Sequence, residues 1–196
     1  AGNGMHVHLS VVDKDGNNVF TVDKNKQPQG LFSQAIGGLL KTTPDFLSFY
    51  APHSNSYRRL VHNGDHAPTT LSWGNENRTA LIRLPEASAK ATRLEFRVAS
   101  ADSNPYLVFA SVLTSVYAGI QDKLQHDKET IGNAHAQHPP ALGVTWKEAV
   151  EKTSVSSLVK DFFGEQFQQC YTCVKEAEIK RFESTITDFE YHSYLR

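Results

Sequence analysis

The sequence predicts an α+β fold, in which a sheet of short strands is backed by long helices. Several short stretches alternate apolar and polar residues, which indicates strands, and the last third has apolar residues at three- and four-residue steps, which is typical of amphipathic helices. The chain has 196 residues, of which 39% are hydrophobic and 21% charged, with a formal net charge of −1. This is the composition of an ordinary globular protein with one large domain or two tightly packed subdomains.

The composition argues against several classes of partner. The 20 lysines and arginines nearly balance the 21 aspartates and glutamates, so no basic nucleic-acid-binding surface is expected. No run of about 18 apolar residues predicts a membrane span. The first residues also lack the apolar core of a signal peptide. We therefore expect a cytoplasmic protein that binds neither nucleic acid nor membranes.

The two cysteines, Cys170 and Cys173, are spaced as C-x-x-C. They fall within a helical pattern and no second pair accompanies them. We therefore expect half-buried helix thiols in a reducing compartment rather than a redox or zinc site.

The alternating stretches predict five strands, at residues 5–12, 19–22, 70–74, 78–84 and 92–99. The first two are joined by "DKDGNN" (13–18), and Asp-Gly between alternating segments is a strong hairpin signal. The chain starts abruptly, on a strand and without methionine, so we expect a piece of a longer protein.

Helices are predicted in the remaining segments. The first covers 31–40, and Pro44 is expected to open a second, short helix. A third covers 101–124, where Asn104 and Pro105 are a start signal. Residues 51–70 are expected to form a long functional loop and 125–145 an exposed connector, and residues from 146 onward are expected to be helical scaffold.

The strand segments carry polar residues in a suggestive pattern. His6 and His8 are two residues apart, so their side chains share one face of a strand. By the same rule Arg93, Glu95 and Arg97 share a face, with Leu94 and Phe96 on the other. Burial of two arginines around one carboxylate is costly unless something binds there. The alternative is an exposed face with a weak ion pair.

Further arginines accompany these residues. Arg78 and Arg83 flank an apolar strand, and Arg58 and Arg59 lie in the long loop. The planar guanidinium donates paired hydrogen bonds to phosphate and carboxylate groups. Together with the strand histidines and carboxylate, these arginines predict a site for an anionic, metal-complexed substrate such as a nucleoside triphosphate.

Four segments in order resemble the signature segments of the glutamine synthetase catalytic domain. They are "GNGMHVHLS", "NSYRRL", "APTTLSWGNENRTALIRLP" and "RLEFRVASADSNPYLVFA", and they lie within residues 2–120. After the connector at 125–145 come C-terminal helices at 146–195, of which residues 159–195 are similar to the C-terminus of gamma-glutamylputrescine synthetase and other gamma-glutamylamine ligases. The resemblance implies the C-terminal part of a catalytic domain of the glutamine synthetase/guanidino kinase type, with a curved antiparallel sheet backed by helices.

The resemblance also implies roles for individual residues. His6 and Glu95 match ligands of a divalent metal, Mg²⁺ or Mn²⁺. Gly2, Arg59 and Arg97 match residues that bind glutamate, and Arg97 lies near its reacting carboxyl group.

Other residues of this chain match those that contact the nucleotide and the transferring phosphoryl group in the family. The residues that match the ATP side of the site are His8, Ser10, Arg83, Lys90 and Arg93, and Arg78 acts with Arg83 on the phosphoryl group. The implied activity is an ATP-dependent ligase that joins the gamma-carboxyl group of glutamate to an amine through gamma-glutamyl phosphate. The family's other metal-binding glutamates precede the matched segments, and the whole protein is expected to be a ring-shaped homo-oligomer.

One loop departs from the family pattern. Ammonia-using members have a glutamate near the end of this loop, whereas this chain has "GDHAP" at 64–68, which places His66 or Asp65 at that position. The change predicts an organic amine as substrate rather than ammonia. If Asp65 replaces the glutamate, an ammonia-using glutamine synthetase remains the alternative.

A non-catalytic relative is the other alternative. Six polar residues argue against it because all are retained: His6, Arg59, Arg78, Arg83, Glu95 and Arg97. A guanidino kinase would need a reactive cysteine in a loop, and both cysteines of this chain fall in a late helix.

Overall fold

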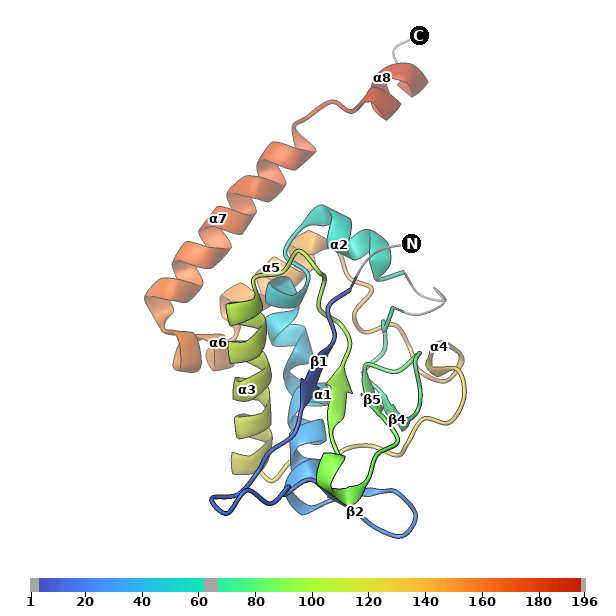
Figure 1. Ribbon diagram of the computed structural model, residues 1–196. Helices are drawn as coiled ribbons and strands as arrows, with labels where there is room; N and C mark the ends of the chain where they lie inside the picture. Colours follow the sequence, from blue (N-terminus) through green and yellow to red (C-terminus); the bar gives the residue numbers. More distant parts are fainter. Residues whose placement is uncertain (1–3, 62–66, 195–196) are drawn as a thin grey trace.

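The computed structural model describes residues 4–61 and 67–194, in which a small sheet packs against helices (Figure 1). A four-stranded sheet has the order β1-β6-β5-β4, with β1 at Val7–Leu9, β4 at Trp73–Asn75, β5 at Ile82–Leu84 and β6 at Leu94–Phe96. The pairs β1–β6 and β5–β6 are antiparallel, whereas β4–β5 is parallel because residues 76–81 lead the chain back to the start of the next strand. The α+β fold is confirmed, but the sheet is not wholly antiparallel.

Helices make up most of the rest. Their bounds are α1 Gly30–Tyr50, α2 Ser54–Arg59, α3 Pro105–Gln121, α4 Ala134–Gln137, α5 Trp146–Val155, α6 Ser157–Phe163, α7 Glu165–Glu183 and α8 Asp188–Tyr194, with a 3₁₀ turn at Ala89–Ala91. The predicted start of α3 is confirmed, because Asn104 accepts hydrogen bonds from the first backbone N–H groups of the helix. Among the described residues, none of the helices has the length and apolar character needed to cross a membrane.

Helix α1 runs through Pro44 without interruption, so the predicted second helix is wrong. Proline removes one helical hydrogen bond. Thr43 Oγ1 donates to the carbonyl of Leu39 at 2.6 Å just before it, and Phe46 and Phe49 just after it are fully buried. Burial of the second half of the helix outweighs the missing hydrogen bond.

Helices α1 and α3 lie side by side and cross at two glycines. A Cβ atom at Gly38 would lie 2.1 Å from the Ser115 carbonyl oxygen, and one at Gly119 would lie 2.2 Å from that of Gln34. Thr42 Oγ1 donates to Ser115 Oγ at 2.6 Å next to this crossing. The two backbones are therefore in direct contact.

The predicted hairpin at 13–18 is present, with Gly16 at a φ of +83° and the Val19 N–H bonded to the Val11 carbonyl. The strand that follows, β2 (Thr21–Val22), pairs with β3 (Pro28–Gln29) in a separate two-stranded sheet. The segment predicted as a loop at 51–70 contains the short helix α2.

Residues 125–145 are not simply exposed, contrary to the prediction. Thr130, Ala134, His135 and Leu142 are buried, and the Thr130 N–H donates to the Trp73 carbonyl beside β4. This segment therefore supports the edge of the sheet.

The C-terminal helices are confirmed as helical. Cys170 and Cys173 are exposed rather than half-buried, because α7 buries the face formed by Gln168, Thr172 and Ile179. Figure 1 shows α7 leading away from the sheet to α8, in which no residue is buried.

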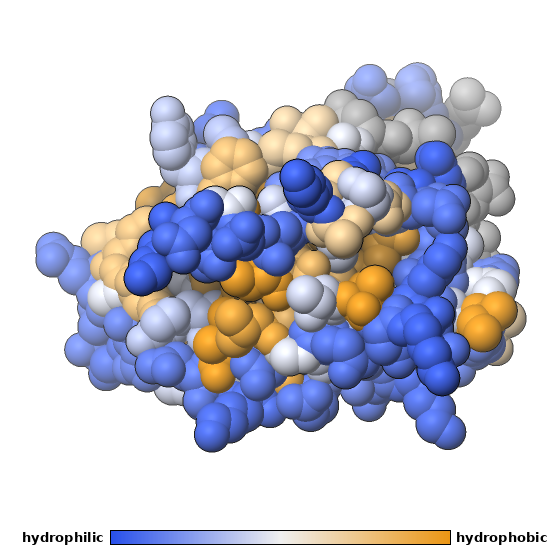
Figure 2. Space-filling view, turned by 60° about the horizontal axis from the view of Figure 1, so that its bottom comes forward, coloured by the Kyte–Doolittle hydropathy of each residue, from blue (hydrophilic) through white to orange (hydrophobic). Residues whose placement is uncertain are grey.

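Large apolar side chains are exposed along one side of α3. Tyr106, Phe109, Leu113 and Tyr117 are each about half exposed or more, and they follow a helical spacing. Figure 2 shows apolar side chains gathered in the middle of one face of the molecule, bordered by hydrophilic groups. Surfaces of this kind are typical of contacts with other chains or segments.

Candidate active site

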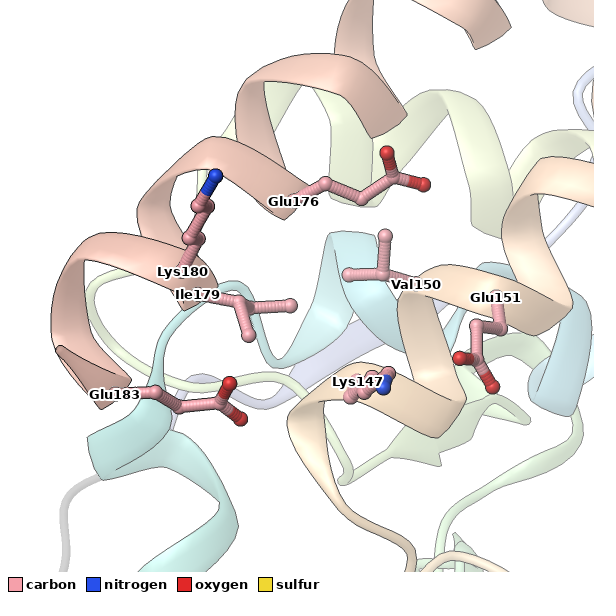
Figure 3. A pocket seen from close by; sticks show the side chains of 7 residues that line it. All are labelled: Lys147, Val150, Glu151, Glu176, Ile179, Lys180 and Glu183. Atoms are coloured by element: carbon pink, nitrogen blue, oxygen red, sulfur yellow. The ribbon is translucent and has the colours of Figure 1, made fainter.

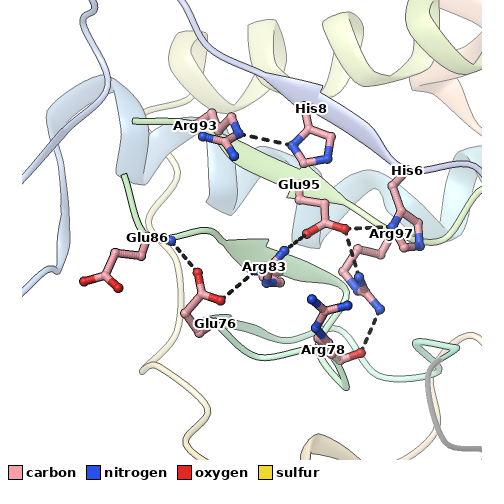
Figure 4. Close-up of polar contacts among 9 residues, drawn as sticks. All are labelled: His6, His8, Glu76, Arg78, Arg83, Glu86, Arg93, Glu95 and Arg97. Carbon is pink, nitrogen blue, oxygen red and sulfur yellow. Dashed lines mark hydrogen bonds and ion pairs between the residues drawn. The ribbon is translucent and has the colours of Figure 1, made fainter. Parts of the chain in front are cut away.

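The polar residues of β1, β5 and β6 meet on one face of the sheet (Figure 4). In the strand register, His8 of β1 and Arg83 of β5 both lie opposite Glu95 of β6. Leu94 and Phe96 are fully buried on the opposite face. The predicted division of the two faces is therefore confirmed.

Glu95 is the centre of this group. Its Oε1 lies 2.7 Å from His6 Nδ1 and accepts from Arg97 Nη1 at 2.9 Å, and its Oε2 accepts from Arg83 Nη1 at 2.7 Å. Burial by itself would raise the pKa of Glu95, but the hydrogen bond from Arg83 and the charge of Arg97 lower it. Glu95 is thus a buried, ionised carboxylate, and the alternative of a weak, exposed ion pair is wrong.

His6 and Glu95 are residue types that can bind a divalent metal. Burial lowers the pKa of His6, and Arg97 lowers it further while Glu95 opposes the shift, which favours the neutral imidazole that binds metals. Two ligand atoms at right angles around a cation with bonds of about 2.1 Å lie about 3.0 Å apart. The 2.7 Å between His6 Nδ1 and Glu95 Oε1 is shorter than this value and is the length of a hydrogen bond. An imidazole and a carboxylate on one face are residue types that fit Mg²⁺ or Mn²⁺.

These two side chains do not complete a metal site. No group of three or more histidine, cysteine, aspartate or glutamate side chains that could hold a metal occurs within residues 4–61 and 67–194. Further ligands would have to come from outside the described part of the chain.

Arg97 is buried beside Glu95, and Arg59 is half-buried at the end of α2. Arg97 is 2% exposed, and its Nη2 donates to the Arg78 carbonyl at 2.9 Å. The Arg59 guanidinium donates to the Val98 carbonyl, and a Cβ at Gly4 would lie 3.2 Å from Arg59 Nη1. A glycine therefore lets the end of α2 approach the start of β1. Burial lowers the pKa of both guanidinium groups.

Arg83 is held by a second carboxylate, which the sequence analysis missed. Its Nη2 donates to Glu76 Oε2 at 2.6 Å, and the other oxygen of Glu76 accepts from the Glu86 backbone N–H. No strand periodicity relates Glu76 to Arg83, because Glu76 lies in the turn after β4. The signal in the sequence is its place inside the segment 67–85, two residues before Arg78.

The other predicted site residues do not contact Glu95 in the described structure. Arg93 Nε donates to His8 Nδ1 at 3.3 Å at the far end of β6. The Arg78 side chain is exposed and lines a hollow of about 410 Å³. Ser10 and Lys90 are exposed, and no side-chain contact joins them to the cluster among the described residues. Gly2, Asp65 and His66 lie outside the described residues.

Another hollow, of about 350 Å³, lies between α5 and α7 and is separate from this cluster (Figure 3). Val150 and Ile179 form its apolar floor, and three glutamates and two lysines surround it: Glu151, Glu176, Glu183, Lys147 and Lys180. Its charges nearly cancel, so it has no preference for a polyanion.

The sheet face is strongly cationic. Among the described residues, Arg83 and Arg97 bond to Glu95, Arg93 bonds to His8, and the charges of Arg59 and Arg78 act on Arg97. Arrangements of this kind bind phosphate and carboxylate groups. The described face therefore gathers cationic donors around one ionised carboxylate.

The chain belongs to the glutamine synthetase family, because the family described as "Glutamine synthetase, catalytic domain" matches residues 1–194. It is 33% identical over 196 residues to the gamma-glutamylputrescine synthetase PuuA of Escherichia coli K12, covering 100% of this chain and 41% of that protein. It is 32% identical over 189 residues to the gamma-glutamylethanolamide synthetase GlnA4 of Streptomyces coelicolor, covering 96% and 40%.

A glutamine synthetase of Thermotoga maritima is 35% identical over 205 aligned positions, covering 99% of this chain and 46% of that protein. The chain thus spans less than half the length of these relatives. The predicted resemblance to the family is confirmed.

Proposed function

We propose that the whole protein is an ATP-dependent ligase that joins the gamma-carboxyl group of glutamate to an amine. The observation that carries this proposal is the buried Glu95, which contacts a neutral histidine on one side and two arginines on the other. This arrangement offers both metal ligands and cationic donors on one face of a sheet. Relatives named for gamma-glutamylamines and for glutamine support the same reaction class.

The proposed reaction has two steps. A gamma-carboxylate oxygen of glutamate attacks the gamma-phosphorus of ATP, the bond from that phosphorus to the bridging oxygen breaks, and ADP leaves. The amine nitrogen then attacks the carbonyl carbon of gamma-glutamyl phosphate, inorganic phosphate leaves, and the nitrogen loses a proton. Activation is necessary because a carboxylate is a poor electrophile.

The residues of this chain divide between the substrates. Arg59 and Arg97, with Gly2, bind glutamate, and Arg78 and Arg83 offset the charge on the transferring phosphoryl group. His8, Ser10, Lys90 and Arg93 contact the nucleotide. Mg²⁺ or Mn²⁺, held by His6 and Glu95 with further ligands from outside the described residues, would supply additional neutralisation of the phosphate charge.

We also propose that the amine is organic, because the loop at 64–68 carries Asp65 and His66 where ammonia-using relatives carry a glutamate. A neutral imidazole could take the proton that the attacking amine loses. The whole protein is further proposed to be a ring-shaped homo-oligomer. The exposed apolar side chains of α3 and α8 support association with other chains.

The test uses the full-length protein. His6→Ala and Glu95→Ala should each lower glutamate-dependent ATP turnover more than about 100-fold, since losing a metal ligand exceeds the 10–100-fold effect of an outer-shell change. Arg181→Ala is the control, because Arg181 is exposed on α7 and is not among the candidate site residues. Activity within about threefold of the wild type in either site variant would contradict the assignment. A wild-type protein without turnover would indicate the non-catalytic alternative.

A further inference from the structure

Arg83 is held by two carboxylates, and only Glu95 belongs to the residues that the family motifs implied. Arg83 Nη1 donates to Glu95 Oε2 at 2.7 Å, and Nη2 donates to Glu76 Oε2 at 2.6 Å (Figure 4). A guanidinium carries its five N–H donors in one plane. Contacts through both terminal nitrogens therefore fix that plane and leave one hydrogen on each of them for another acceptor.

Glu76 is itself held in place by the backbone. Its N–H donates to the Leu84 carbonyl at 3.0 Å, and its second carboxylate oxygen accepts from the Glu86 N–H. Glu76 also has a φ of +51°, a left-handed conformation that favours glycine or asparagine. The carboxylate thus bridges the turn after β4 and the segment after β5, although another residue type would fit that backbone better.

Stability alone does not account for this contact. The Glu76 side chain is 51% exposed, and ion pairs of exposed groups contribute little to folding. The hydrogen bond from Arg83 lowers the pKa of Glu76, as does the one from the Glu86 backbone, so the carboxylate is ionised at neutral pH. A rigid acceptor is therefore present on the side of Arg83 opposite to Glu95.

We propose that Glu76 is a positioning residue that holds the Arg83 guanidinium at the angle at which it contacts the phosphate groups of the nucleotide. The inference rests on the proposed ligase function, in which Arg83 acts on the phosphoryl group. Without Glu76, only the contact with Glu95 would hold the guanidinium, and the group could turn about that contact.

The experiment compares Glu76→Ala with Glu86→Ala in the full-length enzyme. Glu86 is the matched control because it carries the same charge nearby, while its side chain pairs with Lys26 and points away from Arg83 (Figure 4). Glu76→Ala should lower kcat/KM for ATP about tenfold or more. The KM for glutamate and the unfolding temperature should stay close to those of Glu86→Ala.

An Arg83→Ala background tests whether Glu76 acts through Arg83. In that background Glu76→Ala should cause no further loss of kcat/KM, because the group that it positions is gone. Additive losses, or a kcat/KM within twofold of the control in the wild-type background, would overturn the inference. A parallel fall in unfolding temperature and rise in both KM values would also overturn it, in favour of a structural role.

The experiment distinguishes a failure of the ligase proposal from a failure of the positioning role of Glu76. A wild-type protein without glutamate-dependent ATP turnover would overturn the ligase proposal. Calorimetric titration of the same variants with Mg²⁺-ATP would then decide the positioning role, which requires at least a tenfold loss of affinity in Glu76→Ala and none in Glu86→Ala.

Discussion

On the sheet face, the buried side chains of Glu95 and Arg97 are charged and hydrogen-bonded to each other. Where α1 crosses α3, the helices meet through Gly38 and Gly119, and no buried residue of either helix is charged. Burying charges opposes folding unless every charge is paired, whereas close apolar packing favours it. The difference indicates that the helices supply the stability that keeps the charged face in its arrangement.

The helix crossing should be the more sensitive region to added volume. Alanine normally stabilises a helix relative to glycine by about 1 kcal/mol. Gly38→Ala should instead destabilise the protein by about 3 kcal/mol, because its Cβ would lie 2.1 Å from a backbone oxygen. Urea unfolding measures this. Gly143→Ala is the control, since its nearest neighbour would be 3.7 Å away. Equal stability of the two variants would contradict the close contact.

The 196-residue chain should have no ligase activity by itself. We predict that the 196-residue chain folds by itself but forms no gamma-glutamyl product, because its described residues provide only two metal ligands. Circular dichroism tests the fold, and incubation with ATP, glutamate, Mn²⁺ and a panel of amines tests the activity, with the full-length protein as positive control. Product above background would show that the site is more complete than the described ligands indicate.

The identity of the amine should depend on the segment that carries Asp65 and His66. We predict that the full-length enzyme has a higher kcat/KM for putrescine, spermidine or ethanolamine than for ammonia, because the loop has Asp65 and His66 in place of a glutamate. Initial rates with each amine decide this. A preference for ammonia of tenfold or more, about 1.4 kcal/mol in the transition state, would indicate that Asp65 restores an ammonium site.

The smallest effect is expected at the edge of the sheet. Burial by itself would raise the pKa of Glu129, but hydrogen bonds from Asn75 and Gln27 lower it below the ordinary value of 4.5. Its stabilisation is therefore complete above that pH and is lost as the pH falls through the lowered pKa.

Glu129→Gln tests this contact. Both carboxylate oxygens of Glu129 accept hydrogen bonds, one from Gln27 and the other from Asn75. A glutamine has only one side-chain oxygen that can accept, so one of these bonds is lost, and the free energy of unfolding at pH 7 should fall by about 1.5 kcal/mol. Unfolding curves from pH 7 to pH 3 should show this difference shrinking with acidification. A difference that is constant with pH would contradict an ionised Glu129.

Local periodicity predicted the sheet face well. Arg93, Glu95 and Arg97 share a face because side chains alternate along any strand, whatever its partners. Asn104 likewise marked the start of α3 because capping depends only on neighbouring backbone groups.

Features that depend on distant contacts could not be predicted in this way. Helix α1 continues past Pro44 because its second half is buried, and burial is not visible in local sequence. The contact between Glu76 and Arg83 depends on the parallel pairing of β4 and β5, which brings the turn after β4 close to the end of β5. Burial of Thr130 and Leu142 depends on how residues 125–145 cross the sheet edge.

The central claim is that His6 and Glu95 bind one divalent cation on the cationic face. The most direct measurement is the Mn²⁺ affinity of the full-length protein, by calorimetry or electron paramagnetic resonance, for the wild type, His6→Ala, Glu95→Gln and the control Arg181→Ala. The claim predicts affinities at least tenfold weaker in both site variants, with unchanged affinity in the control and folded protein in all four. Wild-type affinity in either His6→Ala or Glu95→Gln would contradict it.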